Sequence, residues 1–173
     1  MPFKRRREGK TDYKKRLVLL KSRKPRFVVR KSLKYIRINL VEFANIGDRT
    51  VASATSHALK KLGWDFALDN IPAAYLTGLM AGKVAKAKGV NEAVLDMGLY
   101  ISTKGSRVYA AVKGAVDAGL KINCDPEMFP AEDRLRGEHT ARHNEKFKEM
   151  PKQFEIVKEK VEKEKVEKLG RKE

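Results

Sequence analysis

The sequence predicts an α/β fold: a three-stranded antiparallel meander, followed by alternating helices and a strand in a mixed sheet. Three short runs rich in β-branched and aromatic residues lie between residues 26 and 54. Residues 56–119 then change to a helical period with capping residues, interrupted by an apolar run at 93–97. Both ends of the chain are highly charged. We therefore expect a basic N-terminal arm at 1–24, a core at 25–124 and a charged, partly helical extension at 125–173.

The arm contains one predicted helix. Residues 5–11 show no apolar period and have no face to pack. From Asp12, a helix N-cap residue, Tyr13, Leu17 and Leu20 share one face at helical spacing. We expect this helix to end before Pro25, because the residue before a proline avoids the helical region.

The three strands are expected at 26–30, 34–41 and 49–54. The second run alternates apolar with polar residues, which is typical of a strand with one buried face. A turn sequence at 45–48 separates the second run from the third. Such short connections predict an antiparallel meander.

Two helices are expected next. Ser56 can cap a short helix that ends at Gly63, and Asn70 can cap a longer one that ends near Gly89. One face of the longer helix carries small residues, and we expect that face to approach the sheet closely. These small residues are Ala74, Gly78, Ala81, Gly82 and Ala85.

The rest of the core alternates strand and helix. The uninterrupted apolar run 93–97 predicts a strand covered on both faces. Residues 105–119 repeat apolar residues at helical spacing, and 120–123 form either a last short strand or the exit from that helix. In the extension, a Lys/Glu run at 158–165 predicts a solvated helix with a thin apolar stripe. The stripe consists of Phe154, Val157 and Val161.

Charge is concentrated at the N-terminus. The 173 residues include 39 Lys and Arg against 22 Asp and Glu, a formal charge of +17. Residues 1–37 alone hold 16 basic and two acidic residues, whereas 38–133 hold 10 and 11. A basic cluster at the end of a neutral domain is typical of a protein that binds a polyanion. The sequence has neither an apolar run of membrane-spanning length nor a secretory signal. Its single cysteine, Cys124, cannot form an internal disulfide. We therefore expect a cytoplasmic protein.

Three weaker patterns have simpler interpretations. The run 78–84 has a glycine spacing that differs from that of a phosphate loop, and it lies within a helical pattern. His139 and His143 lie four residues apart, yet the flanking residues do not match a zinc motif. Residues 103–107 either bind an anion at a helix start or only cap that helix. No nucleophile–base pattern is present, so the sequence predicts neither an enzyme nor a cofactor or metal site.

Aromatic residues accompany the arm's positive charge. Phe3 and Tyr13 could stack on unpaired bases. A localisation signal or a nonspecific tail is the alternative, but basic residues continue into the predicted strands at Arg26, Arg30 and Arg37. An anionic membrane would also attract the arm, although the amphipathic aromatic anchor that such binding needs is weak. RNA binding is the favoured interpretation.

Several segments of the chain resemble a known family. They are residues 5–13, 21–30, 63–64, 70–78, 93–99 and 105–120. In these segments the chain resembles archaeal-type members of the universal L-eighteen family of large-subunit ribosomal proteins, called L-five in eukaryotes. The resemblance implies a structural protein that binds 5S rRNA in the central protuberance of the ribosome. The partners that it implies are 5S rRNA, large-subunit rRNA and a neighbouring 5S-binding ribosomal protein, with no membrane.

The resemblance and the charge map together give fourteen expected RNA-binding residues. They are Lys4, Arg5, Arg6, Arg7, Lys10, Thr11, Tyr13, Lys14, Lys15, Arg16, Arg26, Arg30, Ser32 and Lys34. The alternatives are a nucleic-acid-modifying enzyme and a free-standing nucleic-acid-binding protein. The former would need an acidic or metal cluster beside the basic surface, and the latter a recognition helix.

Overall fold

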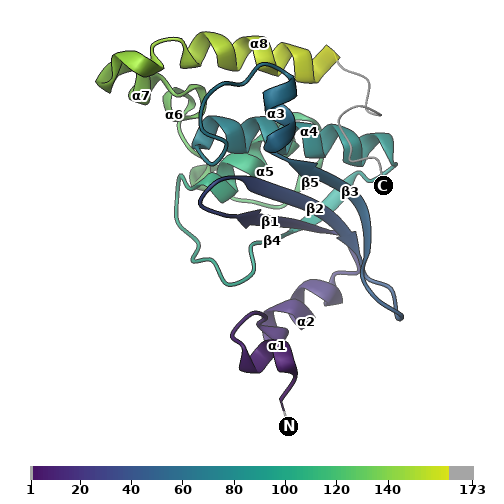
Figure 1. Cartoon of the computed structure of the whole chain (residues 1–173). Helices are drawn as coiled ribbons and strands as arrows, with labels where there is room; N and C mark the ends of the chain where they lie inside the picture. The colour runs from purple at the N-terminus through teal and green to yellow at the C-terminus, as the bar shows by residue number, and fades with distance from the viewer. Residues whose placement is uncertain (1, 164–173) are drawn as a thin grey trace.

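The computed structural model describes residues 2–163 and contains a five-stranded mixed sheet with helices on one side and the N-terminal arm on the other (Figure 1). The strands are β1 (Arg26–Lys31), β2 (Ile36–Glu42), β3 (Arg49–Thr55), β4 (Glu92–Asp96) and β5 (Lys121–Ile122). Their order is β3-β2-β1-β4-β5. The pairs β1–β2 and β2–β3 are antiparallel, whereas β1–β4 and β4–β5 are parallel. The predicted meander and mixed sheet are confirmed.

The two faces of the meander differ in polarity. In β2, Ile36, Ile38 and Leu40 are buried, whereas Arg37 between them is exposed. Successive side chains of a strand point to opposite faces, so the apolar set faces the helices and the polar set faces the arm. Arg37 pairs with Arg30 of β1 in the ladder. The face toward the arm is therefore polar and basic.

Three helices cover or adjoin the apolar face: α3 (His57–Lys61), α4 (Ile71–Ala87) and α5 (Arg107–Asp117). Asn70 caps α4 as predicted, because its side chain accepts a hydrogen bond from the Ala73 N–H at 2.8 Å. Ser56 precedes α3 but does not cap it. Its hydroxyl instead accepts from the Ile36 N–H at 3.0 Å, so this buried serine joins β2 to the start of α3.

Gly78 and Gly82 of the small-residue face of α4 pack against α5, whereas we expected that face to approach the sheet. An added Cβ at Gly78 or Gly82 would overlap backbone atoms of Ala111 or Ala115. The two helix backbones come this close only because glycine lacks a Cβ. α4 also contacts β2 and β3.

β4 is also less covered than its apolar sequence predicts. Ala93 and Asp96 are buried, but Val94 and Leu95 are only half-buried. The arm side of β4 borders a pocket, described below, to which Leu95 and Asp96 contribute. The short strand expected at 120–123 is present as β5, which ends the sheet beside β4.

The C-terminal part of the chain forms an outer helical layer above α4 (Figure 1). It comprises the 3₁₀ turns η1 (Pro126–Met128) and η2 (Glu145–Phe147) and the helices α6 (Glu132–Arg136), α7 (Glu138–His143) and α8 (Met150–Lys163). The predicted apolar stripe of α8 is fully buried, with the Phe154 ring 5.5 Å from that of Tyr75 in α4. α8 therefore contributes to the core, and only its other face is solvated. Residues 164 and 165 of the expected Lys/Glu helix lie outside the described residues.

The arm lies on the opposite side of the sheet and contains α1 (Lys4–Arg7) and α2 (Tyr13–Lys21) (Figure 1). The predicted helix after Asp12 is confirmed, and the Asp12 carboxylate accepts from the N–H groups of Lys14 and Lys15. α1 was not expected. Although Leu17 lies on the predicted apolar face of α2, its side chain is 59% exposed. Within residues 2–163, no helix combines the length and apolar character that crossing a membrane requires.

Candidate nucleic-acid interface

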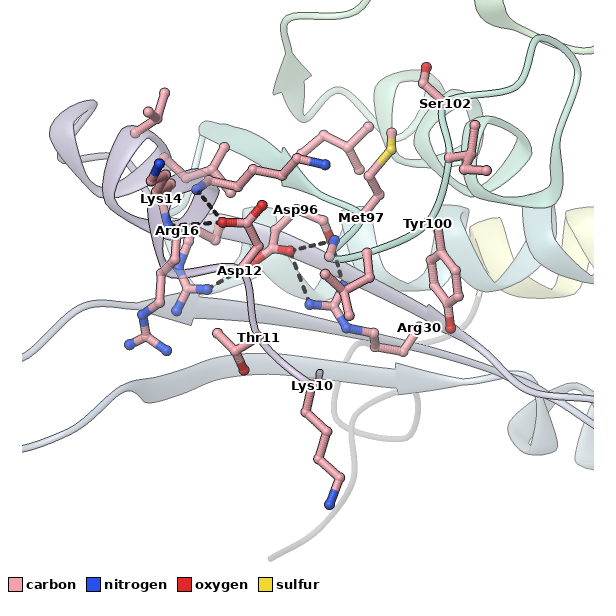
Figure 2. A pocket seen from close by; sticks show the side chains of 18 of the residues that line it. Lys10, Thr11, Asp12, Lys14, Arg16, Arg30, Asp96, Met97, Tyr100 and Ser102 are labelled. Atoms are coloured by element: carbon pink, nitrogen blue, oxygen red, sulfur yellow. Dashed lines mark hydrogen bonds and ion pairs between the residues drawn. The ribbon is translucent and has the colours of Figure 1, made fainter. Parts of the chain in front are cut away.

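The arm, the sheet and the loop after β4 enclose a pocket of about 860 Å³ (Figure 2). Seven basic residues line it against two acidic ones, an excess of five positive charges. The basic residues are Arg5, Lys10, Lys14, Lys15, Arg16, Arg26 and Arg30, and the acidic ones are Asp12 and Asp96. We call this cavity the basic pocket. Its charge favours an anionic ligand.

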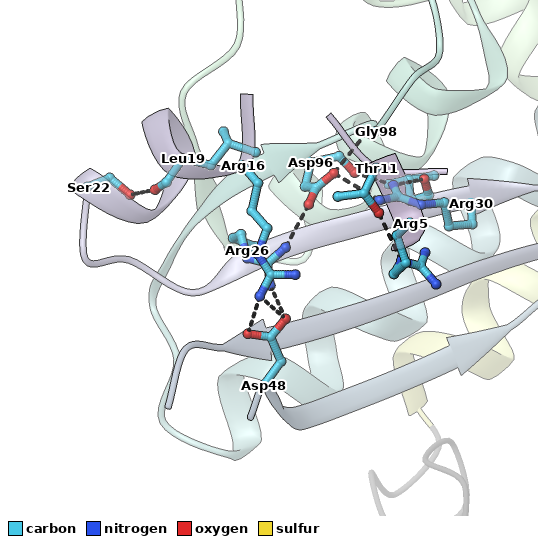
Figure 3. A network of polar contacts seen from close by, with 11 residues as sticks. Arg5, Thr11, Arg16, Leu19, Ser22, Arg26, Arg30, Asp48, Asp96 and Gly98 are labelled. Carbon is cyan, nitrogen blue, oxygen red and sulfur yellow. Dashed lines mark hydrogen bonds and ion pairs between the residues drawn. The ribbon is translucent and has the colours of Figure 1, made fainter. Parts of the chain in front are cut away.

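Arg26 lies at the base of the pocket and is buried, with 5% of its surface exposed. Its guanidinium donates to Asp96 at 2.8 Å and to Asp48 at 2.6 Å (Figure 3). A buried charge is tolerated when it is paired in this way. The sequence placed Arg26 among the expected RNA-binding residues. In the structure its two Nη groups donate to carboxylates within the protein, so Arg26 holds Asp48 and Asp96 in position.

Asp48 connects the arm to the sheet. This residue precedes β3, and both its carboxylate oxygens accept from Arg16 of α2, at 3.0 and 2.9 Å (Figure 3). Because the same carboxylate accepts from Arg26, Asp48, which lies 32 residues after Arg16, links α2 to β1. The arm is thus held by a paired polar contact.

Asp96 fixes the orientation of Arg30. Its carboxylate accepts from Arg30 at 3.0 Å, from Arg26 and from the Gly98 N–H at 2.9 Å. Burial raises the pKa of Asp96, but the hydrogen bond and charge of Arg30, with the hydrogen bonds from Arg26 and the Gly98 N–H, outweigh burial and hold that pKa below its ordinary value. The Arg30 side chain remains 42% exposed. Arg30 is therefore preorganised at the pocket wall with surface left for an anion.

Near the tip of the arm, two aromatic rings lie together. The rings of Phe3 and Tyr13 are 4.9 Å apart, and Arg5 donates to the Thr11 hydroxyl at 2.9 Å. Tyr13 also lines a second, smaller pocket of about 330 Å³, together with Arg6 and Leu99. Tyr13 thus has a ring partner in Phe3 and still borders an open cavity.

The structure brings most of the fourteen expected residues together. The eight that line the basic pocket are Arg5, Lys10, Thr11, Lys14, Lys15, Arg16, Arg26 and Arg30. Arg6 and Tyr13 line the smaller pocket, while Lys4, Arg7, Ser32 and Lys34 line neither. Ser32 shapes the β1–β2 turn, since its hydroxyl accepts from the N–H groups of Lys34 and Tyr35.

Sequence reasoning missed the loop at residues 97–102, which forms part of the wall of the basic pocket together with the arm. Tyr100 anchors this loop to β1: its hydroxyl donates to the Lys31 carbonyl at 2.8 Å and accepts from the Lys31 N–H at 3.2 Å. The loop places Leu99 and Ile101 in the pocket wall with exposed side chains. An apolar residue in a loop is not by itself a signal of a site, because single exposed hydrophobic residues are common on protein surfaces.

The structure does not support a functional site at the three weaker sequence patterns. Residues 78–84 lie inside α4, which excludes a phosphate loop. Lys104 and Arg107 are paired with Glu127 and Asp69, so each cation of the 103–107 segment has a carboxylate beside it. In the described part of the chain, no three His, Cys, Asp or Glu side chains gather closely enough to hold a metal ion.

Comparisons with known proteins agree with the resemblance noted from the sequence. The model of the family described as ribosomal large subunit proteins 60S L5 and 50S L18 matches residues 1–92 and 82–125. The large ribosomal subunit protein uL18 of Korarchaeum cryptofilum is 56% identical to this chain over 147 residues. That alignment covers 85% of this chain and 75% of the relative.

Proposed function

The chain belongs to the family of ribosomal large subunit proteins 60S L5 and 50S L18, and from this premise we propose that it binds 5S rRNA in the ribosome. As a member of this family it is a structural protein of the large subunit and not an enzyme. The finer proposal is that it anchors 5S rRNA in the central protuberance of the cytoplasmic ribosome. Large-subunit rRNA and a neighbouring 5S-binding ribosomal protein are its proposed further partners.

One observation supports the RNA surface most directly: the arm and β1 bring seven basic residues around a single pocket on the uncovered face of the sheet. Lys and Arg side chains that neutralise phosphates release condensed counterions, which is the main source of RNA affinity. The opposite face of the sheet is covered by α4 and α5 and offers no comparable surface.

The proposed contacts differ in role. The exposed arm side chains, Arg5 and Lys10 among them, would bind phosphates directly, and Arg30 would do so from the pocket wall. Arg26 would act indirectly, by fixing Asp48 and Asp96 in place. Lys4, Arg7, Ser32 and Lys34 are all exposed, so an RNA extending beyond the pocket could reach them.

A mobility-shift titration tests the proposal. The purified protein should bind 5S rRNA more tightly than equal masses of tRNA or duplex DNA. If about six phosphates are neutralised, affinity should fall about 10³-fold between roughly 50 and 200 mM salt. Equal affinity for all three nucleic acids would contradict specific 5S rRNA binding, and a nearly flat salt titration would contradict the dominance of phosphate contacts.

A further inference from the structure

We propose that the basic pocket receives an unpaired nucleotide of the RNA, with its base against the apolar side chains of α2 and the 97–102 loop. This inference rests on the proposed function, and it specifies which part of an RNA occupies the site. The pocket lies between α2, β1 and the loop after β4, and its wall is assembled from all three (Figure 2).

The apolar part of the pocket wall is the first argument. Val18 and Leu19 contribute from α2, and Leu99 and Ile101 contribute from the loop. None of the four belongs to the hydrophobic core or packs against it, and all but Leu19 are more than half exposed. A phosphate gains nothing from such side chains. The face of a base does gain, because binding removes apolar surface from water on both sides.

The charge of the pocket is the second argument. An apolar side chain of a protein partner could also enter the pocket. The rest of that partner would then face the pocket's excess of five positive charges, which an apolar side chain does not balance. A nucleotide satisfies both parts of the wall at once: its base meets the apolar residues, and its phosphates meet the cations. Proteins that bind single strands likewise combine a basic groove for the backbone with side chains, mostly aromatic, that cover the faces of the bases.

Size is the third argument. A pocket of about 860 Å³ lies in the range of small-ligand sites, ~300–1,000 Å³. It can admit a single nucleotide, whereas a duplex presents its bases stacked and paired. Proteins that recognise RNA sequence mostly bind loops and bulges, whose bases can turn out of the stack. The occupant is therefore an unpaired nucleotide, and the flanking duplex lies across the exposed arm.

The chain offers two matched pairs of variants to test this. Val18 and Leu17 are neighbours on α2 with exposed fractions of 66% and 59%, but only Val18 lines the pocket. Ile101 and Ile46 are both highly exposed, and only Ile101 lines it. Val18→Glu and Ile101→Glu therefore place a carboxylate in the pocket. Leu17→Glu and Ile46→Glu add the same charge elsewhere on the surface.

The experiment probes the base reactivity of full-length 5S rRNA, free and bound to each full-length protein, with dimethyl sulfate and a carbodiimide. Thermal unfolding of each variant checks its fold. With the unmodified protein, at least one unpaired base should lose its reactivity. Val18→Glu and Ile101→Glu should both restore that base's reactivity and bind about tenfold more weakly than their controls, whereas the controls should keep the protection.

The outcomes separate the inference from the function. If the unmodified protein fails to bind 5S rRNA, both are wrong. If it binds and all five proteins give the same footprint, the inference alone is wrong, as expected for a pocket that holds an acidic peptide segment of a protein partner. Restored reactivity at different bases for Val18→Glu and Ile101→Glu would also overturn it, because one occupied pocket requires one base.

Discussion

The two ends of the described chain are both rich in charge, yet they are attached to the core by different forces. α8 buries Phe154, Val157 and Val161 against α4 and exposes its charges on the other side. α2 leaves Leu17 and Val18 exposed and is joined to the sheet by Arg16 and Asp48.

This difference shows that charge content does not determine whether a segment is part of the core. The deciding feature is whether an apolar stripe finds a complementary surface to remove it from water. α8 contributes stability through that burial. The arm, held by a polar contact and left with exposed apolar residues, is the part of the molecule available for a partner.

The largest expected effect concerns core packing. Phe154→Ala should lower the free energy of unfolding by about 3–5 kcal/mol, because it leaves a cavity between α8 and α4. Leu17→Ala, on the exposed face of α2, should change it by less than about 0.5 kcal/mol. Denaturant unfolding measures both. Equal effects would show that the arm and α8 are held in the same way.

The polar network below the arm should respond to acid, unlike the packing of α8. Asp96→Asn should cost about 3 kcal/mol, because it leaves Arg26 buried without one of its carboxylates. The pKa of Asp96 is lowered in the folded protein, so the stability from this group is present above the unfolded pKa of about 3.9 and is lost as the pH falls through the folded pKa.

Unfolding measured between about pH 5 and 2 tests this pH dependence. The unmodified protein should lose more stability over that interval than Asp96→Asn does. Parallel curves for the two proteins would mean that Asp96 does not contribute to the acid sensitivity.

Removing the tip of the arm should separate binding from folding. Deleting residues 1–11 should leave the melting temperature almost unchanged, since residues 2–10 are all exposed. Affinity for 5S rRNA should nevertheless fall at least about tenfold, or 1.4 kcal/mol.

A full-length control in which Lys4, Arg5, Arg6, Arg7 and Lys10 are replaced by Gln separates charge from chain length. If this variant binds as the unmodified protein does, then the arm acts through its aromatic residues and not its charges. Loss of cooperative unfolding in the deletion variant would instead place the arm within the core.

The smallest expected effect is that of Asp48→Asn on RNA affinity, and its direction is opposite to the one that charge alone predicts. Asp48→Asn removes a negative charge near the basic pocket, which by charge alone should strengthen RNA binding. We expect it to weaken binding about threefold, because α2 loses its link to Arg26 and β1.

Glu42→Gln, at the last residue of β2, is the matched control. Glu42 forms no ion pair with any of residues 2–163, so its neutralisation should leave affinity unchanged or slightly raised. Titrations at one fixed salt concentration compare the two variants. Equal strengthening by both would show that Asp48 has no role in positioning the arm.

Local patterns in the sequence were sufficient for most of the fold. Asp12 and Asn70 were recognisable as helix caps because capping involves residues only two or three positions apart. The alternation of β2 predicted its buried face for the same reason. The expectations that differed from the structure depended on which partner an element meets: α4 brings Gly78 and Gly82 to α5, and Ser56 bonds to β2 instead of capping α3.

The sequence by itself determined where the positive charge lies, which segments are helix or strand, and that the N-terminal end carries the RNA-binding surface we propose, because these properties belong to neighbouring residues. Only the tertiary structure decided that Arg26 is buried while Arg30 stays exposed. Both lie on the same face of β1, and they differ because Arg26 is paired with both Asp48 and Asp96, far away in sequence, whereas Arg30 is paired with Asp96 alone. The pocket wall at 97–102 likewise depends on a contact far apart in sequence, the hydrogen bond from Tyr100 to Lys31, which joins residues 69 positions apart.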